Sequence, residues 1–367
     1  MTAPVRLLVG KKLLAGWESV DVVKSLTSLC GTFTVAQSAT HSDQDETFLP
    51  IFPGDRVEIQ LEGSPVMVAW VDKVSPKVDA RSHSIGVEGR EITCDLVDCG
   101  LLGSAGLWKK ITLPQLVTQL VQPFGLVYSS EGGADVGQAF PKFSAEPGDT
   151  IFQTITKAAT VRGVLPVTTA AGAVTLIQEG KKRSTDRLVY GSNVVTASGA
   201  YDLKDRFSSY TIKGTSPAPP GAGYFSGNKT FHSQGQATDP AVTRYRPMVA
   251  MGSGEQNHRA VQDRANWEAQ TRAAKSSTLE IQVRGWVQSD GSLWECGRLV
   301  SVEVPYLLGK GSQDFLISQV RYTYGSGGTV AVLSLVHPGA FKKLPENKKA
   351  QPGQTDAWAS VRKATRS

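Results

Sequence analysis

The sequence is poor in the residues that build metal centres and disulfide frameworks. Its 367 residues include four cysteines and five histidines. No two cysteines show C-x-x-C spacing, and Cys94 and Cys99 have no histidine pair nearby, so we expect buried free thiols and no metal site. The histidines stand singly along the chain, which is typical of surface or structural residues.

Long apolar runs are also missing. No stretch approaches the roughly eighteen apolar residues that a membrane-spanning helix needs. The apolar start of the chain is interrupted by Arg6, Lys11 and Lys12, unlike the core of a signal peptide. We therefore expect no membrane-spanning segment and a protein that is made and kept in a cytoplasm-like compartment.

The net charge of +6 is concentrated at one end. Residues 341–367 contain seven basic and two acidic side chains. A basic, proline-containing terminus is more often a solvated or partner-ordered extension than a nucleic-acid arm.

Sequence motifs of catalysis are absent as well. The chain has no P-loop, no H-E-x-x-H and no G-x-S-x-G motif. The acidic residues Glu88, Glu91 and Asp95 are close in sequence, but with Arg90 among them they are interpreted as exposed strand and turn residues. We expect no catalytic, cofactor-binding or metal-binding residues, no cofactor, and a protein that is not an enzyme.

Three aromatic residues could stack on a ligand. Trp286 and Trp294 flank Asp290-Gly291, a tight hairpin signal, and Tyr306 follows. Aromatic side chains that bracket such a turn usually pack across the two strands, so packing is favoured over ligand stacking.

Glycine and proline are plentiful, at 37 and 19 residues, which favours many turns between short strands. The most informative feature is a duplication, in which a glycine turn enters an alternating strand and further strands follow. The matched segments are 53–61 with 296–304, 68–74 with 316–322, and 31–35 with 277–283. The spacing is too long for a solenoid, so the sequence predicts two homologous small antiparallel β-barrels.

Three helices are predicted between and beside the two copies. A Thr112 cap precedes an amphipathic helix over 113–121, and Asp149 or Thr150 caps a second helix from Ile151 to Ala159. Residues 256–275 form the third. A strand is expected at 173–177, and residues 215–236, rich in Pro, Gly, Ser and Asn, are expected to form a surface loop.

These elements give a mainly β (α+β) fold of two barrels with an inserted α/β domain and a helix-containing connection. The expected boundaries are 1–100 for the first barrel, 101–185 for the insert, 186–276 for the connecting region, 277–341 for the second barrel with strands contributed from 186–214, and 342–367 for the basic extension.

Two sets of residues stand out in this order of elements. They are Arg259, Ala260, Arg264, Ala265, Glu268 and Arg272 of the third helix followed by Val283, Gly285-Trp286, Gly291, Leu293-Trp294, Gly297, Val300 and Val302, and the run 146–152 with Arg162-Gly163. In these residues and their order the chain resembles the baseplate hub proteins of Mu-like contractile-tail phages, within the wider tail hub and late-control family. One departure is Cys296, where the family often has proline before the glycine.

The resemblance implies a structural, virion-borne component of the tail baseplate, assembled in the host cytoplasm. Family members form homotrimers in which two similar barrels per chain make a ring of six. Such a ring meets a six-fold tail tube protein or tube-proximal baseplate protein on one side and a three-fold central spike protein on the other. It would surround a channel for DNA that passes without specific binding, with Glu58, Gln60, Ser301 and Glu303 as candidate lining residues. The loop 215–236 and the basic extension are candidate subunit contacts.

Two other functions remain open from the residues. A tail-associated cell-wall hydrolase could use two acids that are distant in sequence and converge in space. An OB-like nucleic-acid-binding protein would also combine small barrels with a basic balance.

Overall fold

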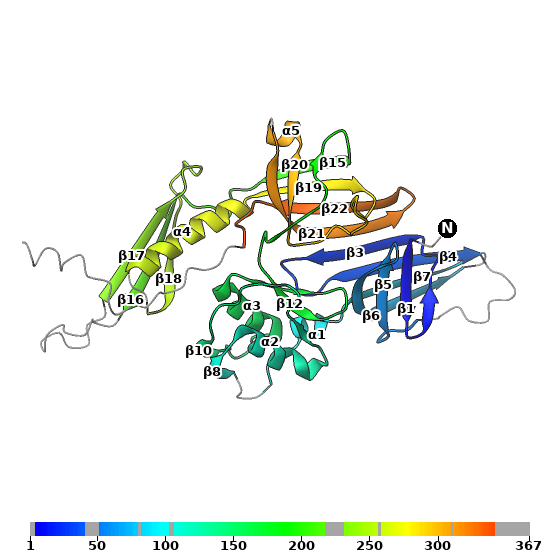
Figure 1. The fold of residues 1–367 in the computed structure, drawn as a ribbon, viewed down its shortest axis with the longest axis horizontal. Coiled ribbons are helices and arrows are strands. Elements are labelled where there is room, and N and C mark those ends of the chain that lie inside the picture. Colours follow the sequence, from blue (N-terminus) through cyan, green and yellow to red (C-terminus); the bar gives the residue numbers. More distant parts are fainter. Residues whose placement is uncertain are drawn as a thin grey trace, which may run out of the picture. The chain divides into compact units, whose positions relative to one another are not determined.

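The computed structural model of the chain describes residues 4–40, 51–79, 82–102, 106–216, 231–255, 258–309 and 311–341. These residues fall into two compact units (Figure 1). The first unit contains the described residues up to 205 and those from 271 onward, and the second contains those between 206 and 270. The basic extension at 342–367 lies outside the described residues.

The first unit is built on a sheet of fourteen strands. Its main path runs β15-β19-β22-β21-β3-β4-β7-β6-β5-β1-β2, and β20, β13 and β14 lie off this path. The expected mainly β, antiparallel character is confirmed. Among the described residues, the strand pairings do not close either half into a barrel.

Two sets of five strands make up most of this sheet. The first copy consists of β3 (Ser19–Ser25), β4 (Thr32–Thr40), β5 (Arg56–Leu61), β6 (Ser64–Val78) and β7 (Ser82–Glu91). The second copy consists of β15 (Val194–Tyr201), β19 (Ser277–Arg284), β20 (Arg298–Glu303), β21 (Gln313–Gly325) and β22 (Gly328–Val336). Short strands flank them: β1 (Val5–Val9), β2 (Lys12–Leu14), β13 (Lys182–Arg183) and β14 (Leu188–Val189).

The two copies share one topology, which confirms the duplication. The order β5-β6-β7-β4-β3 in the first copy matches β20-β21-β22-β19-β15 in the second. In each copy a glycine of positive φ precedes the first strand of this order. The φ angle is +91° at Gly54 before β5 and +84° at Gly297 before β20, a conformation that suits a residue without Cβ. The Gly54 amide donates to Val71 O at 2.8 Å, and the Gly297 amide donates to Ile317 O at 2.9 Å.

These equivalent hydrogen bonds fix the alignment of β6 with β21. Each strand bulges directly afterwards, at Asp72 in β6 and at Ser318 in β21. The structural match therefore pairs Asp72 with Ser318. The alignment of 68–74 with 316–322 expected from sequence is wrong by two residues, because alternation alone cannot distinguish registers that differ by a multiple of two.

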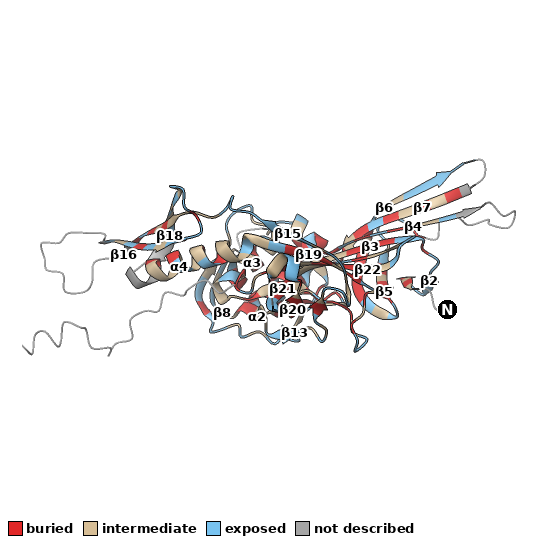
Figure 2. Cartoon of the chain, turned by 90° about the horizontal axis from the view of Figure 1, so that it is seen from above, coloured by how far each residue is buried: buried red, intermediate tan, exposed pale blue. Residues whose placement is uncertain are grey.

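The core of each copy is formed by buried residues of these strands, and buried residues are coloured red in Figure 2. Equivalent core positions are filled by side chains of different size in the two copies. In the first copy Phe33 faces Gly89, and a Cβ at Gly89 would lie 2.5 Å from the Phe33 ring and 2.1 Å from Trp70 O. In the second copy, Leu279 faces Leu335. The backbones of β6 and β7 therefore pack closely at Gly89.

The inserted segment is a small α/β region with its own apolar cluster. Thr112 accepts a hydrogen bond from the Gln115 amide, and Thr150 accepts one from the Gln153 amide, so both predicted caps are confirmed. The elements are α1 (Cys94–Asp98), β8 (Leu107–Ile111), α2 (Leu113–Val121), the short helix η1 (Gln122–Phe124), β9 (Tyr128–Ser129), β10 (Phe140–Ser144), α3 (Ile151–Arg162), β11 (Leu165–Thr168) and β12 (Val174–Ile177).

The second unit is a three-stranded sheet covered by a helix. Its strands are β16 (Ser209–Ser216), β17 (Phe231–Thr238) and β18 (Pro247–Glu255), in the order β17-β16-β18. The predicted helix is present as α4 (His258–Lys275). A Cβ at Gly235 would lie 2.3 Å from the Val261 carbonyl, so the helix backbone packs directly on β17.

The predicted loop over 215–236 is wrong at both ends. β16 continues to Ser216, and β17 begins at Phe231. Residues 217–230 of that prediction lie outside the described residues. The sequence of β17, FHSQGQAT, has almost no apolar alternation, so its pattern did not predict a strand.

Candidate assembly site at the junction of the two copies

The two copies join edge to edge within one chain. β21 of the second copy pairs antiparallel with β3 of the first, from Gln319 opposite Ser25 to Tyr324 opposite Val20 (Figure 1). Arg321 Nε lies 3.0 Å and 2.8 Å from the two carboxylate oxygens of Asp21. These bonds raise the pKa of Arg321. The result is one continuous sheet across the junction.

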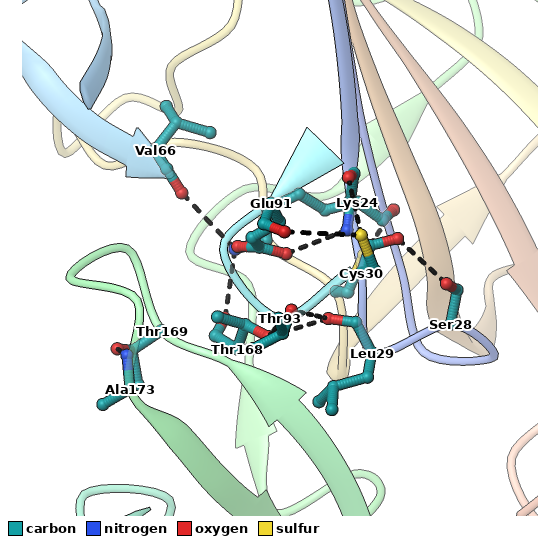
Figure 3. A network of polar contacts seen from close by, with 12 residues as sticks. Lys24, Ser28, Leu29, Cys30, Val66, Glu91, Thr93, Thr168, Thr169 and Ala173 are labelled. Atoms are coloured by element: carbon teal, nitrogen blue, oxygen red, sulfur yellow. Dashed lines mark hydrogen bonds and ion pairs between the residues drawn. The ribbon is translucent and has the colours of Figure 1, made fainter. Parts of the chain in front are cut away.

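Lys24, on the same strand β3, is the centre of a polar network beneath this junction (Figure 3). Its ammonium group donates to Glu91 Oε1 at 2.8 Å, to Thr168 O at 3.0 Å and to Val66 O at 3.4 Å. The three acceptors come from β7, β11 and β6. Lys24 therefore connects the first copy to the inserted region through one side chain.

Glu91 is the buried partner of Lys24. Its side chain is 1% exposed, and its second oxygen accepts from the Gly31 amide at 2.9 Å. Burial raises the pKa of Glu91, while Lys24 and the Gly31 amide favour the charged form. The interpretation of Glu91 as an exposed residue is wrong, because the inserted region covers the end of β7 where exposure was expected.

Two threonines extend the network to the loop after β3. The hydroxyl of Thr93 donates to Leu29 O at 3.1 Å, and that of Thr168 donates to the same oxygen at 2.7 Å (Figure 3). Both threonines are buried. A buried network in which each member has a partner fixes the relative placement of the elements that contribute to it.

A cavity of about 350 Å³ opens beside this network. Lys24 and Glu91 line it but are bonded to each other. Glu295, also in the lining, accepts from Arg298 at 2.7 Å. Glu91 and Glu295 are thus each neutralised by a cation, an arrangement that stabilises a junction and differs from a pair of carboxylates poised for acid and base catalysis.

The cysteines near the junction are free thiols. Burial raises the pKa of Cys296 to about 12. The Cys30 thiol donates to Gly31 O at 3.3 Å, and interaction with the Cys94 side chain raises the pKa of Cys30 and lowers that of Cys94. Cys94 is buried as expected, whereas Cys99 is exposed, because it directly follows the last residue of the short helix α1. The expectation of burial is wrong for Cys99.

The other acidic candidates do not converge with Glu91. Glu88 is half exposed and bonds to Lys73 at 3.0 Å, and Asp95 is exposed on α1. Among the described residues, no group of three or more His, Cys, Asp or Glu side chains could hold a metal ion. Within the same residues, every helix is too short or too polar to cross a membrane.

The aromatic residues of the predicted hairpin pack in the core. Trp286 and Trp294 are buried, and Trp286 Nε1 donates to Thr323 O and Val330 O at 3.1 Å each. The turn is present, since the Gly291 amide donates to Gln288 O at 2.9 Å. Tyr306 is different, because its ring is exposed. It lies edge to face with the ring of Tyr190, and the two ring centroids are 5.4 Å apart.

The four candidate channel residues occupy matching places in β5 and β20. Glu58 and Gln60 alternate with buried Val57 and Ile59, as Ser301 and Glu303 alternate with buried residues of β20. All four are partly exposed. Glu303 bonds to Arg187 at 3.1 Å, and Gln60 donates to Glu58 at 3.1 Å. The sequence alignment of these two strands is confirmed by the structure.

Three family models match consecutive parts of the chain. They are the N-terminal domain of Mu phage baseplate assembly protein GpP-like proteins over residues 4–91, the second domain of baseplate hub protein gp44-like proteins over 93–178, and the fourth domain of Mu phage baseplate assembly protein GpP over 257–344.

Individual relatives agree with these models. The baseplate hub protein gp44 of Escherichia phage Mu is 33% identical over 322 residues, which cover 87% of this chain and 84% of that protein. The 43 kDa tail protein of prophage MuSo2 from Shewanella oneidensis is 28% identical with a TM-score of 0.78 over 93% of this chain and 99% of that chain. A tail protein from Neisseria meningitidis MC58 shares the fold at 22% identity, with a TM-score of 0.76 over 92% and 97% of the two chains. The chain belongs to the baseplate hub protein family of Mu-like phages and is a structural component of the tail baseplate.

Proposed function

We propose that three copies of this chain form a closed ring that adapts a six-fold tail tube to a three-fold spike. The observation that carries the proposal is the matching topology of the two copies in each chain. Three chains then present six nearly equivalent sheets, while the parts that occur once per chain keep three-fold symmetry. The duplication thus supplies both symmetries with one polypeptide.

The partners follow from this geometry. The side of the ring that presents six equivalent sheets fits a tail tube protein or tube-proximal baseplate protein, and the other side fits a central spike protein. The inserted region and the second unit occur once per chain, so they suit contacts of three-fold symmetry. The domain boundaries expected from sequence, and the basic extension as a subunit contact, belong to the same proposal.

The ring would surround the path of the DNA. Glu58 and Gln60 of β5 and their equivalents Ser301 and Glu303 of β20 are proposed to face it. Acidic side chains repel the phosphate groups of DNA, and neutral side chains supply no charge that attracts them. DNA would therefore pass without being held. In this proposal the chain acts by shape and position and has no catalytic residues.

Electron microscopy of the purified chain tests the proposal. Averages viewed along the symmetry axis should show a ring with six similar lobes around an opening. Rings of another order, or particles without an opening under conditions where the chain self-associates, would contradict it.

A further inference from the structure

The junction between the two copies has a counterpart that the chain leaves open. The bulges at Asp72 and Ser318 make residues 73–78 of β6 equivalent to residues 319–324 of β21. Gly199 of β15 faces Leu279 as Val22 of β3 faces Phe33, so residues 197–202 are equivalent to residues 20–25. Within one chain β21 pairs with β3. The equivalent strands are β6 and β15.

Both equivalent strands have an open edge among the pairings that the structure describes. Residues 73–78 of β6 pair with β7 on one side, and β15 pairs with β19 on one side. Residues of β3 that face the core are buried, whereas most of β15 is exposed. The exposed fraction is 64% for Tyr201 of β15 and 63% for Val78 of β6. An open, partly apolar strand edge is a template for pairing with another chain.

We infer that β6 of one chain pairs with β15 of a second copy in the antiparallel register of the internal junction. In this register Ser75 lies opposite Ala200 of the second copy, and Lys77 lies opposite Ser198. Lys73, which bonds to Glu88 of its own chain at 3.0 Å, lies opposite Asp202, so Asp202 adds a second carboxylate of complementary charge at this end of the edge. Residues 197–200 of β15 read Ala-Ser-Gly-Ala, the last three of which are exposed, and their small side chains permit close approach.

The internal junction and the junction between chains differ in the side chains that line them. The ion pair between Arg321 and Asp21 crosses the internal junction. The equivalent residues at the open edges are Ser75 and Ser198, so this pair is not repeated between chains. Pro76 on β6 also lacks an amide donor, which makes the edge less prone to unspecific pairing. The junction between chains is therefore weaker than the internal one and forms when copies gather.

This inference rests on the proposed ring and assigns its subunit contact. The test places cysteines at Ser75 and Ala200 in a Cys99→Ser background, with oxidation by copper phenanthroline in air. Facing positions of paired antiparallel strands lie about 4.5–5.5 Å apart at Cα, which suits a disulfide. A covalent trimer as the largest species on a non-reducing gel supports the inference. The double variant Ser75→Cys/Ser198→Cys, two residues out of register, should give at most a trace.

The internal junction supplies the positive control. The variant Gln319→Cys/Ser25→Cys should form a disulfide within one chain and add no mass. A charge exchange provides an independent measurement, since Lys73→Glu should raise the concentration for half-assembly about two- to fivefold and added Asp202→Lys should restore it.

The outcomes separate this inference from the proposed ring. If light scattering shows trimers while the in-register pair does not cross-link, or cross-links no better than the out-of-register pair, the assigned contact is wrong and the ring stands. If the chain neither cross-links nor self-associates at any concentration, both fail. Cross-linked species that grow beyond the trimer would keep the contact and overturn the closed ring.

Discussion

Removing the buried carboxylate of Glu91 is expected to destabilise the first unit strongly. The side chain is 1% exposed, and it lies 2.8 Å from Lys24 Nζ and 2.9 Å from the Gly31 amide. In Glu91→Ala, Lys24 keeps two carbonyl acceptors but loses its counter-charge. Removing one partner of a buried ion pair costs about 3–5 kcal/mol. At about 2 °C per kcal/mol for a unit of this size, the melting temperature should fall by roughly 6–10 °C.

The assay is thermal unfolding followed by tryptophan fluorescence, which reports on the first unit because Trp17, Trp286 and Trp294 are buried in it. The matched control is Glu88→Ala on the same strand. Its carboxylate bonds to Lys73 at 3.0 Å with both side chains about half exposed, so the loss should be within about 1 kcal/mol. A melting temperature of Glu91→Ala within about 2 °C of this control would refute the reasoning.

Three further predictions concern stability. The raised pKa of Glu91 means that the folded state holds the proton more tightly than the unfolded state, so the wild type gains stability below the ordinary pKa near 4.5 and loses it as pH rises through the folded pKa. The unfolding free energy of the wild type minus that of Glu91→Gln, from urea titrations, should fall over that window; a rise would contradict the assigned shift. Gly89→Ala should cost about 1–3 kcal/mol because its Cβ would lie 2.1 Å from a backbone oxygen, whereas Gly325→Ala, with no atom within 4 Å, should cost less than half as much in the same titration. Thr150→Ala should lose about 1 kcal/mol by calorimetry with its helix cap, and Thr160→Ala, exposed inside the same helix, should be near neutral; equal losses would argue against the cap.

The duplication could be predicted from sequence because its signals are local. A glycine of positive φ before an alternating strand leaves a recognisable pattern, and Gly54 and Gly297 both carry it. The helix caps at Thr112 and Thr150 were predicted for the same reason, since each cap depends on residues within one turn.

The features that the sequence did not predict depend on contacts distant along the chain. Lys24 and Glu91 are 67 residues apart, and no local pattern distinguishes a paired, buried glutamate from an exposed one at the end of a strand. The connection from β20 to β21 is longer than that from β5 to β6, so alternation alone could not place β21 relative to its match β6. β17 is a polar strand held by its neighbours β16 and α4, so its own sequence carries no strand signal.

In the proposed ring, two equivalent sheets per chain and three chains make six similar parts. The number of chains can be measured as absolute mass by light scattering coupled to size exclusion, over a range of protein concentration and salt. A closed ring of three chains should give a species of three times 39.2 kDa whose mass stays constant as concentration increases further. A dimer, a tetramer or a mass that keeps rising with concentration would contradict it.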